Sequence, residues 1–454
     1  MPQSTPFRDT RPEMPVRPLG PYRRLLAFRR NALEAWPKQA YEQDSFAQSL
    51  FGRRLLLLNA PEAIRHVMVE NAGNYRRSPA GIRILRPIVG LGLFLSEGEA
   101  WRFQRQTIAP ALAPRVLPLF VPHIVGATEE AIQRLARMPG PVDLLAALQF
   151  LTLEIAGRSM FSLEMQQHGP ALRALIRRFG ERLGRPYPLD LLLPARIPNL
   201  RDLARRRFRK DWLGLMDAMI AARRALGPAE APRDLFDLML AARDPETGEG
   251  FSHENLRDQL ATIIVAGHET TALALFWSLY LLASASDVQE RLAAELGGRD
   301  LGAGAAGAAL PGLAYTRAVA SEALRLYPPA YVIVRECIGG DRWPGTEISP
   351  GALVMISPWV LHRHRKYWTD PDAFDPARFL PEAPPVPRMA YLPFGVGPRV
   401  CVGAQFAMNE TVLALALLVQ RFRIERADGG AVHPMAVVTT QPQRPAPFRL
   451  TPRS

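Results

Sequence analysis

The ten residues from Phe394 to Gly403 constrain the fold of this chain more than any other segment. They read Phe-Gly-Val-Gly-Pro-Arg-Val-Cys-Val-Gly and place Cys401 in a glycine-rich turn. An apolar helical pattern begins near Ala404, so the positive end of a helix and its free N–H groups are expected beside the sulfur. Gly397 and Gly403 would let the backbone approach a flat ring closely. The segment therefore predicts a thiolate that binds a metal.

This spacing matches the haem-thiolate signature of the cytochrome P450 family, which the chain resembles. The resemblance makes Cys401 the iron ligand of haem b, with Gly403 beside it. It also implies that Phe394 covers the sulfur and that Arg399 pairs with a haem propionate. The residues alone leave another interpretation open, a buried structural cysteine in a turn. The implied fold is mainly α-helical with small β-sheets, one large helical body with a β-rich side.

A second motif, Ala-Gly-His-Glu-Thr-Thr over 266–271, lies inside an apolar run from Leu260 to Leu282 that predicts a long buried helix. Glycine and threonine are unfavourable in the middle of a helix, so packing or function must explain them. If Thr270 donates to the Ala266 carbonyl four residues back, the helix opens slightly and Gly267 leaves room for a diatomic molecule.

In the family resemblance, Ala266 and Gly267 border the oxygen-binding groove beside the haem, and Glu269 and Thr270 relay protons to dioxygen. The residues alone also fit a kinked core helix with a solvent-facing acid. His268 invites a metal-ligand interpretation, but the family motif varies at this position, so we do not expect it to bind iron.

Glu322 and Arg325 lie three residues apart on a predicted helix, a spacing usual for a surface ion pair. The resemblance implies instead a buried triad of Glu322, Arg325 and Arg378 that holds the segment leading to the cysteine. The family often has glutamate where Ala377 stands, which removes a secondary contact only.

Trp101 and Arg105 share one face of a helix whose start is predicted by Ser96 and Glu99 as a capping box. Taken alone, they fit the edge of a core. In the resemblance both reach a haem propionate, and Arg335 reaches the other.

The stretch 80–95 has few regular signals and resembles the loop that covers the substrate in this family. Arg83 and Arg86 lie there among apolar residues. Either could anchor a carboxylate, which would indicate a fatty-acid hydroxylase, or both could point to solvent. The implied substrate positions are largely apolar and indicate a hydrophobic small molecule. They are Leu93, Phe94, Ile263, Ala266, Ala330, Tyr331, Ile333 and Val438.

Composition sets the expected compartment and domain organisation. The 454 residues include only two cysteines, Cys337 and Cys401, so no disulfide framework is implied and a reducing cytoplasm is favoured. Residues 1–22 read as a polar, proline-rich leader without an apolar run long enough for a transmembrane anchor. Residues 23–454 are expected to form a single P450 domain, and the protein is expected to be a monomer. Shorter signals predict a strand at 55–58, a link between lid helices at 184–199 and a hairpin near 437–440.

The formal charge is +13, and all basic residues but three are arginine, which resembles the coding bias of a GC-rich bacterium. A basic cluster at 205–210 could bind nucleic acid, but it begins a helical pattern, so a solvated helix start is favoured and no nucleic acid is expected. We expect an acidic ferredoxin or flavodoxin, with its NAD(P)H reductase, to dock on the Cys401 side. The cations expected there are Arg102, Arg363, Arg365 and Lys366.

The segment His362-Arg363-His364-Arg365 carries His364-Arg365 where P450 relatives commonly have Asp-Pro. A His-x-His pair resembles half of a zinc site, but no further ligand is suitably spaced. Added positive charge on the docking face is the favoured interpretation.

Together these motifs predict a soluble, bacterial-type haem-thiolate monooxygenase that hydroxylates a hydrophobic molecule with electrons from a separate protein. Two alternatives remain at this point. One is a hydroxylase driven by peroxide. The other is a haem-binding carrier or sensor without turnover, which would need Cys401 but neither Glu269 nor Thr270.

Overall fold

The structure is a computed structural model that describes residues 7–50, 52–193, 197–227, 229–243, 247–343 and 346–453. It is mainly helical. The α-helices are α1 (Pro21–Arg30), α2 (Pro61–Arg65), α3 (Pro79–Val89), α4 (Gly98–Ile108), α5 (Leu117–Ala136), α6 (Leu144–Phe161), α7 (Gly169–Arg178), α8 (Pro188–Leu192), α9 (Leu200–Ala225), α10 (Leu235–Ala241), α11 (His253–Ser284), α12 (Ser286–Leu296), α13 (Ala306–Ala309), α14 (Ala314–Leu326), α15 (Pro358–Leu361) and α16 (Ala404–Arg421).

Short 3-10 and π-helical turns complete the helical part. They are η1 (Ala32–Ala35), η2 (Lys38–Tyr41), η3 (His66–Glu70), η4 (Ala72–Asn74), η5 (Ala109–Leu112), η6 (Pro114–Val116), η7 (Phe179–Leu183), η8 (Leu310–Gly312) and η9 (Pro376–Phe379).

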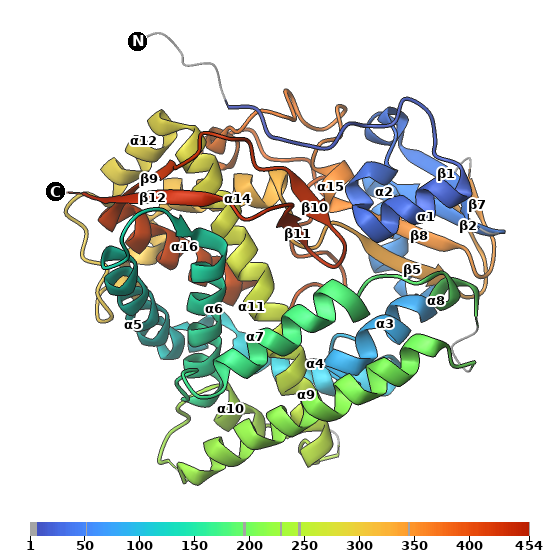
Figure 1. Ribbon diagram of the computed structural model, residues 1–454. Coiled ribbons are helices and arrows are strands. Elements are labelled where there is room, and N and C mark those ends of the chain that lie inside the picture. Colours follow the sequence, from blue (N-terminus) through green and yellow to red (C-terminus); the bar gives the residue numbers. More distant parts are fainter. Residues whose placement is uncertain are drawn as a thin grey trace.

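Four small sheets accompany the helices. The strands are β1 (Ser45–Leu50), β2 (Arg53–Leu58), β3 (Tyr75–Arg77), β4 (Val142–Asp143), β5 (Ile333–Cys337), β6 (Asp341–Trp343), β7 (Thr346–Ile348), β8 (Leu353–Ile356), β9 (Phe422–Arg426), β10 (Pro434–Ala436), β11 (Thr440–Pro442) and β12 (Pro447–Pro452). The largest sheet has the order β1-β2-β8-β5-β3, and β4-β12-β9, β6-β7 and β10-β11 are separate. In Figure 1 the largest sheet lies with α1 and α2 on one side of the molecule, and α5 and α6 lie on the other.

Helix α11 is the central element of the core, which confirms the predicted helix at 260–282. Its start is capped by Ser252, whose hydroxyl accepts the Asn255 N–H at 3.2 Å. The helix is apolar on all sides because it packs against α6, α14 and α16 rather than against solvent. It therefore carries its motif through the middle of the protein (Figure 1).

Two helices, α6 and α11, are long and apolar enough to cross a bilayer by length and composition, and the bent pair Gly98–Leu112 with Pro114–Ala136 would make a third. The apolar windows of α6 and α11 are 67% and 72% buried inside the fold. Burial in the core therefore accounts for their apolar composition.

The stretch 80–95, predicted to be an irregular loop, is helical over most of its length, so that prediction is wrong. Ser78 caps α3 by accepting the Gly81 N–H at 3.1 Å, and Pro79 occupies the first turn, where its missing N–H costs nothing. The helix ends at Gly90, which has a φ of +60° and leaves no room for a Cβ beside the Asp258 carboxylate. Pro87 and the three glycines in this stretch concealed the helical pattern.

The predicted capping box before Trp101 is also wrong. Helix α4 begins at Gly98, and its N-cap Glu97 makes no side-chain capping bond. The Ser96 hydroxyl donates instead to Gln104 Oε1 at 2.7 Å, because the chain is extended through Glu97 and only then turns into the helix.

The expected boundary at residue 22 does not mark a change in packing. The carboxylate of Asp9 is buried in an ion pair with Arg363, and the ring of Phe7 meets Tyr280 edge-on at 5.9 Å. Helix α1 begins at Pro21. Residues 7–14 therefore belong to the folded body rather than to a separate leader.

The remaining sequence predictions concern three short segments. The leucine run at 55–58 forms most of β2, and residues near 437–440 form the turn of the β10–β11 hairpin. The expected link at 184–199 contains the short helix α8 and joins η7 to α9; residues 194–196 lie outside the described residues.

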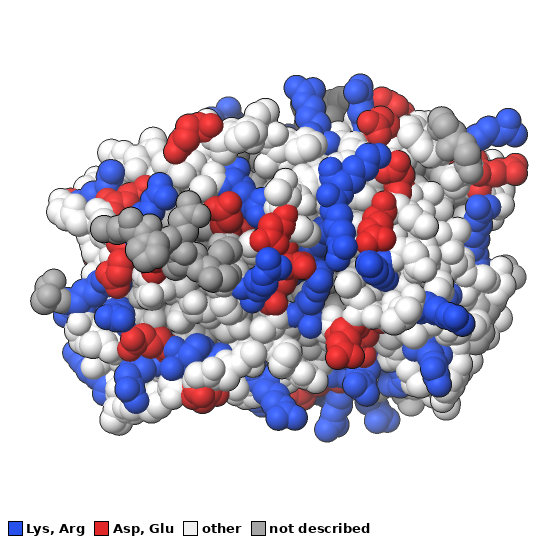
Figure 2. Space-filling view, turned by 90° about the horizontal axis from the view of Figure 1, so that it is seen from above, with Lys and Arg blue, Asp and Glu red and all other residues white. Residues whose placement is uncertain are grey.

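The formal charge of the chain is +13. Figure 2 shows a face on which Lys and Arg form a band that is bordered by Asp and Glu on both sides. Many arginines are paired, as in Arg158–Glu130 and Arg453–Glu290. This pattern gives no support to a nucleic-acid surface.

Candidate functional site: a cysteine loop beneath the central helix

The loop around Cys401 is closed by its own backbone. The Cys401 N–H donates to the Phe394 carbonyl at 2.9 Å, and the Val400 N–H donates to the Gly397 carbonyl at 3.0 Å. Gly395 and Gly397 have φ values of +71° and +76°, in the left-handed region that favours glycine. The sequence of the motif therefore fits a tight turn that ends at the first residue of α16.

Gly397 and Gly403 differ in the space around them. A Cβ on Gly397 would lie 2.0 Å from the Met68 carbonyl oxygen, so this glycine makes room for the backbone of η3. The sequence had predicted that it makes room for a flat ring. A Cβ on Gly403 would meet nothing within 4 Å among the described residues. Only Gly403 thus leaves space on the side where a flat ring would lie.

The Cys401 thiol lies at the N-terminus of α16. Burial raises its pKa, whereas the Gly403 N–H and the nearby charge of Arg105 act in the opposite direction. The residue has a solvent-accessible surface although protein atoms surround it densely. On the opposite element, Ala266 is exposed in the middle of the otherwise buried α11. Both observations are consistent with a space between the cysteine loop and α11.

Three arginines gather at one edge of this space. Arg77 and Arg335 are directly opposite in the register of β3 and β5, and Arg399 stacks over the Trp101 ring with its Cζ 4.5 Å from the centroid. Arg399 also donates to the Ser96 carbonyl at 2.8 Å and pairs with Glu97. Arg105 donates to the Val400 carbonyl at 2.8 Å and so supports the cysteine loop from outside.

The arginine cluster carries more positive charge than the protein offsets. Burial, together with repulsion from Arg335 and Arg399, lowers the pKa of Arg77 to about 9. Burial and repulsion from Arg399 lower the pKa of Arg335 to about 10. Arg77 Nε is buried without a hydrogen-bond partner in the described chain. The two propionates of a haem would supply the missing anions, so these residues fit that cofactor.

Arg77 is the member of this cluster that the sequence did not reveal. It stands in a three-residue strand with no motif around it, and only the pairing of β3 with β5 brings it to Arg335. Its guanidinium lies 4.6 Å above the ring of Phe94.

The middle of α11 has the hydrogen bond from Thr270 to Ala266 that the motif predicts. Thr270 Oγ1 donates to the Ala266 carbonyl at 2.5 Å. Beside it, a Cβ on Gly267 would find only Met160 Cε, at 3.8 Å. His268 points to the other side of the helix, where Nε2 lies 2.9 Å from the Gln149 carbonyl oxygen and burial lowers the pKa to about 4. It is therefore a core histidine directed at α6, away from Cys401.

Glu269 is held by residues that sequence reasoning did not single out. Its Oε1 accepts hydrogen bonds from Thr439 at 3.2 Å and from Gln441, both on the β10–β11 hairpin. Burial raises its pKa, while these two donors lower it. The acid is thus enclosed rather than solvent-facing.

The apolar positions expected around the substrate come from four parts of the chain: the segment after α3, the middle of α11, residues 330–333, and the β10–β11 turn. Leu93 follows α3 and is tied to α11 by the bond from its N–H to Gln259 Oε1 at 2.9 Å. Tyr331 donates to the Val437 carbonyl at 2.9 Å, which brings the segment after α14 to the hairpin. Ile333 Cδ1 lies 3.6 Å from a Cβ built on Gly395, so this side chain reaches the cysteine loop. The remaining positions with accessible surface are Phe94, Ile263, Ala266, Ala330 and Val438.

Glu322, Arg325 and Arg378 are brought together. Arg325 Nε lies 2.6 Å from Glu322 Oε2 with both side chains fully buried, and Arg378 Nε lies 3.5 Å from Glu322 Oε1. Arg325 also donates to the carbonyls of Pro371 and Ala373. These bonds tie the segment that leads to Cys401 to the rigid helix α14.

The expectation for His364-Arg365 and its neighbours requires a correction. Arg363 is buried, pairs with Asp9 and lies over Trp359 with 3.6 Å from Cζ to the ring centroid. His364 is buried as well, with Nε2 3.1 Å from the Gln43 carbonyl oxygen. Neither adds charge to the surface, whereas Arg365 is exposed and lies 3.4 Å from Glu42 Oε1. Within the part of the chain that the structure describes, no His, Cys, Asp and Glu side chains form a cluster suited to a metal ion.

Arg83 is not available as a substrate anchor. Its guanidinium donates to the Leu193 carbonyl at 3.3 Å and lies 3.4 Å from Asp202 Oδ2, so it holds the α8–α9 segment against α3. Arg86 is exposed on the outer face of α3. Neither arginine is therefore placed to anchor a substrate carboxylate.

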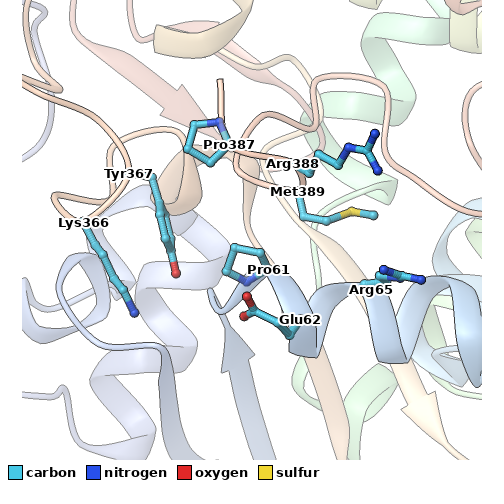
Figure 3. A pocket seen from close by; sticks show the side chains of 8 residues that line it. All are labelled: Pro61, Glu62, Arg65, Lys366, Tyr367, Pro387, Arg388 and Met389. Atoms are coloured by element: carbon cyan, nitrogen blue, oxygen red, sulfur yellow. The ribbon is translucent and has the colours of Figure 1, made fainter. Parts of the chain in front are cut away.

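A surface hollow of about 540 Å³ lies between α2 and the segment 366–389, and it contains none of the predicted site residues. Figure 3 shows Lys366 on one side, Arg65 and Arg388 on the other, and Glu62 and Tyr367 between them. Two of these cations are already paired, Lys366 with Asp44 at 2.8 Å and Arg65 with Glu70 at 2.9 Å. Beyond α2, the chain continues to Met68, whose carbonyl touches the cysteine loop at Gly397.

Comparison with known proteins agrees with this geometry. Residues 38–448 match the family model described as Cytochrome P450. The chain is 34% identical to cyclooctatin synthase of Streptomyces melanosporofaciens, over 82% of this chain and 81% of that protein. It is 31% identical to cyclooctat-9-en-7-ol 5-monooxygenase of the same organism, over 83% and 81%. The crystal structure of the cytochrome P450DA heme domain superimposes with a TM-score of 0.81 at 25% identity, covering 99% of both chains.

The fold and the cysteine loop together define an oxidoreductase with a haem held by a cysteine thiolate. The chain belongs to the cytochrome P450 family. Its predicted fold class is confirmed, and its relatives support a monooxygenase activity.

Proposed function

We propose that the protein inserts one oxygen atom of dioxygen into a hydrophobic small molecule, with Cys401 as the proximal ligand of haem b. The observation that carries this proposal is the position of the Cys401 sulfur, at the start of α16 and near Arg77, Arg335 and Arg399, three arginines that share the single carboxylate of Glu97. When bound, the haem supplies dioxygen activation and transfer of one oxygen atom to carbon. The protein supplies the sulfur, the cations for the propionates and the route for protons.

The proton route consists of Glu269 and Thr270. Burial raises the pKa of Glu269 above its ordinary value, which favours the protonated form that a proton donor needs. The Thr270 hydroxyl, which donates to the Ala266 carbonyl, is the next residue along α11. This acid and alcohol pair favours dioxygen chemistry over peroxide-driven hydroxylation and over a carrier or sensor without turnover. Steady NADH consumption with a surrogate ferredoxin system separates these functions.

Electrons come from a separate acidic ferredoxin or flavodoxin with its NAD(P)H reductase, and the protein works in the cytoplasm as a monomer. The cations available for docking are Arg102, Arg365, Lys366 and those around the hollow in Figure 3, of which Arg388 makes no ion pair within the described residues. The contact between Met68 and Gly397 links this side of the molecule to the cysteine loop.

The substrate is a neutral, largely apolar molecule. The pocket positions are apolar, and Arg83 is already paired with the α8–α9 segment. The name of the relative cyclooctat-9-en-7-ol 5-monooxygenase indicates an unsaturated alcohol as its substrate, which has no carboxylate.

The test is a titration of the ferric protein with lauric acid and with its methyl ester, following the low-spin to high-spin Soret shift. We expect the ester to bind at least as tightly as the acid. A preference of about tenfold or more for the acid, worth about 1.4 kcal/mol, would contradict a neutral substrate and restore a carboxylate anchor.

A further inference from the structure

The carboxylate of Glu269 is clamped by a hairpin 170 residues further along the chain. Thr439 Oγ1 donates to Glu269 Oε1 at 3.2 Å, Gln441 Nε2 donates to the same oxygen, and Gln441 Nε2 also lies 3.0 Å from Thr439 Oγ1. No side chain or backbone group of the described residues is hydrogen-bonded to Glu269 Oε2. Both donors thus converge on one oxygen and leave the other for a different partner.

The hairpin that carries these donors is fixed on both sides of its turn. On the β10 side of the turn, the Tyr331 hydroxyl donates to the Val437 carbonyl at 2.9 Å. On the other, Thr440 Oγ1 donates to the Pro328 carbonyl at 2.7 Å, and Trp277 Nε1 donates to the Thr440 carbonyl at 2.9 Å. Because Trp277 lies on α11 as Glu269 does, the hairpin is held in register with the helix that it clamps.

We propose that Thr439 and Gln441 are positioning residues for proton delivery. This proposal rests on the role of Glu269 in the function proposed above. With Oε1 fixed by two donors, the proton of the neutral acid resides on Oε2 and is passed to a water or hydroxyl beside Thr270 when the Oε2–H bond breaks. The two donors then stabilise the carboxylate that remains, and a proton from solvent restores the acid.

Thr439 and Gln441 are the polar groups that act most strongly on the pKa of Glu269. Burial raises its pKa, and Thr439 and Gln441 lower it. The titratable group on the facing segment, Tyr331, uses its hydroxyl on the Val437 carbonyl. Removing either donor therefore disfavours the carboxylate without removing a charge.

The test uses the haem-loaded protein and the variants Thr439→Val and Gln441→Met, which remove each donor at nearly constant volume. Thr439→Ser keeps the hydroxyl. Gln443→Met makes the same change as Gln441→Met on an exposed residue beyond β11. Each variant is first checked for the Soret band of the reduced, carbon-monoxide-bound form, so that a misfolded protein is not compared.

The first measurement is an infrared pH titration of the carbonyl stretch of protonated Glu269, assigned by its loss in Glu269→Gln. We expect the midpoint to rise by about one pH unit in Thr439→Val and Gln441→Met, because a hydrogen bond to a charged group contributes about that much. Thr439→Ser and Gln443→Met should leave it unchanged. A hairpin with only a structural role would not shift this midpoint.

The second measurement is the rate of NADH oxidation with dioxygen and a surrogate ferredoxin system. We expect Gln441→Met and Thr439→Val to slow it by about tenfold, less than the roughly hundredfold or more that a general acid contributes, because Glu269 itself remains in both variants. If Glu269→Gln is slowed but neither donor variant differs from Gln443→Met in rate or midpoint, the clamp is wrong and the relay stands. If Glu269→Gln itself oxidises NADH like wild type, the relay is wrong and the clamp falls with it.

Discussion

At the scale of single residues, the most informative finding is how the structure separates neighbours in the 266–271 motif. Thr270 and Glu269 face the side of α11 where Ala266 is accessible and the hairpin docks, whereas His268 is turned into the contact with α6. With 3.6 residues per turn, adjacent residues of an α-helix point in different directions, so His268 and Glu269 contact different neighbours. Proton transfer and core packing are therefore assigned to adjacent positions.

Thr270→Ala tests the alcohol of the proposed proton route. The change removes the hydroxyl bonded to the Ala266 carbonyl, so protons should reach dioxygen out of sequence and NADH electrons should end in peroxide. We expect the share of NADH recovered as peroxide to rise severalfold, with Thr270→Ser close to wild type. The measurement is peroxide released per NADH consumed. Equal peroxide yields in the alanine and wild-type proteins would remove Thr270 from the route.

His268 predicts an acid-dependent loss of stability. Its pKa is lowered by burial to about 4 in the folded state, below the ordinary value of 6.5, so the unfolded chain binds the proton more tightly. The stabilisation is complete above pH 6.5 and is lost as the pH falls from 6.5 toward 4. Between pH 7 and pH 5 this residue should cost about 2 kcal/mol.

The comparison is between His268→Gln and His253→Gln, the latter an exposed histidine at the start of the same helix. Urea unfolding should show a shallower loss of stability at acid pH for His268→Gln and an unchanged loss for His253→Gln. The prediction fails if the two variants lose stability in parallel with wild type.

At the scale of elements, the sequence predicted which segments hold the proposed site residues more accurately than it predicted where the helices begin. The long apolar run over α11 and the start of α16 were predicted, because burial and a glycine-rich turn leave clear signals. Helix α3 was missed, since Pro87 and flanking glycines obscure its period. The Ser96 to Glu99 pattern was misread, because the same residues also serve an extended approach to the helix.

Gly397 shows how elements meet at the cysteine loop. Its φ of +76° disfavours any other residue, and a Cβ would collide with the Met68 carbonyl at 2.0 Å. Gly351 has a similar φ of +78° but open space around it. Gly351→Ala should therefore cost about 1 kcal/mol for the left-handed backbone alone, and Gly397→Ala roughly 3 kcal/mol or more.

The free energies of unfolding in urea, measured side by side, decide this prediction. Equal losses in Gly397→Ala and Gly351→Ala would contradict it. They would show that η3 and the cysteine loop move apart to admit the added methyl group without a measurable loss of folding free energy.

At the scale of the whole molecule, the cluster around the proposed cofactor was only partly visible in the sequence. Trp101, Arg105, Arg335 and Arg399 were named through the family pattern. Arg77 was not, because it reaches the cluster through strand pairing between distant segments. Thr439 and Gln441 were missed for the same reason, since their contacts with Glu269 span about 170 residues. Such long-range pairs leave no local periodicity.

The net charge of +13 predicts an electrostatic component in partner binding. Electron transfer from an acidic ferredoxin should weaken as salt rises, because screening shortens the reach of surface charges. Arg388→Glu, at the hollow in Figure 3, should slow the reaction about fivefold at low salt. The same charge change at Arg206, exposed on α9, is the control.

The measured quantity is the rate of electron transfer against ionic strength for both variants and wild type. Identical salt dependence in all three, or a rate that ignores salt, would mean that the basic charge does not guide the partner.

The most direct test of the account is the absorption of the reduced, carbon-monoxide-bound protein with each of its two cysteines replaced. Cys401 is expected to be the iron ligand, and Cys337 is buried in β5 as the only other cysteine. Wild type and Cys337→Ser should show the red-shifted Soret band of a thiolate-ligated haem, and Cys401→Ser should lack it. If Cys401→Ser keeps that band, the haem-thiolate site at Cys401 is contradicted, and the mechanism built on it falls.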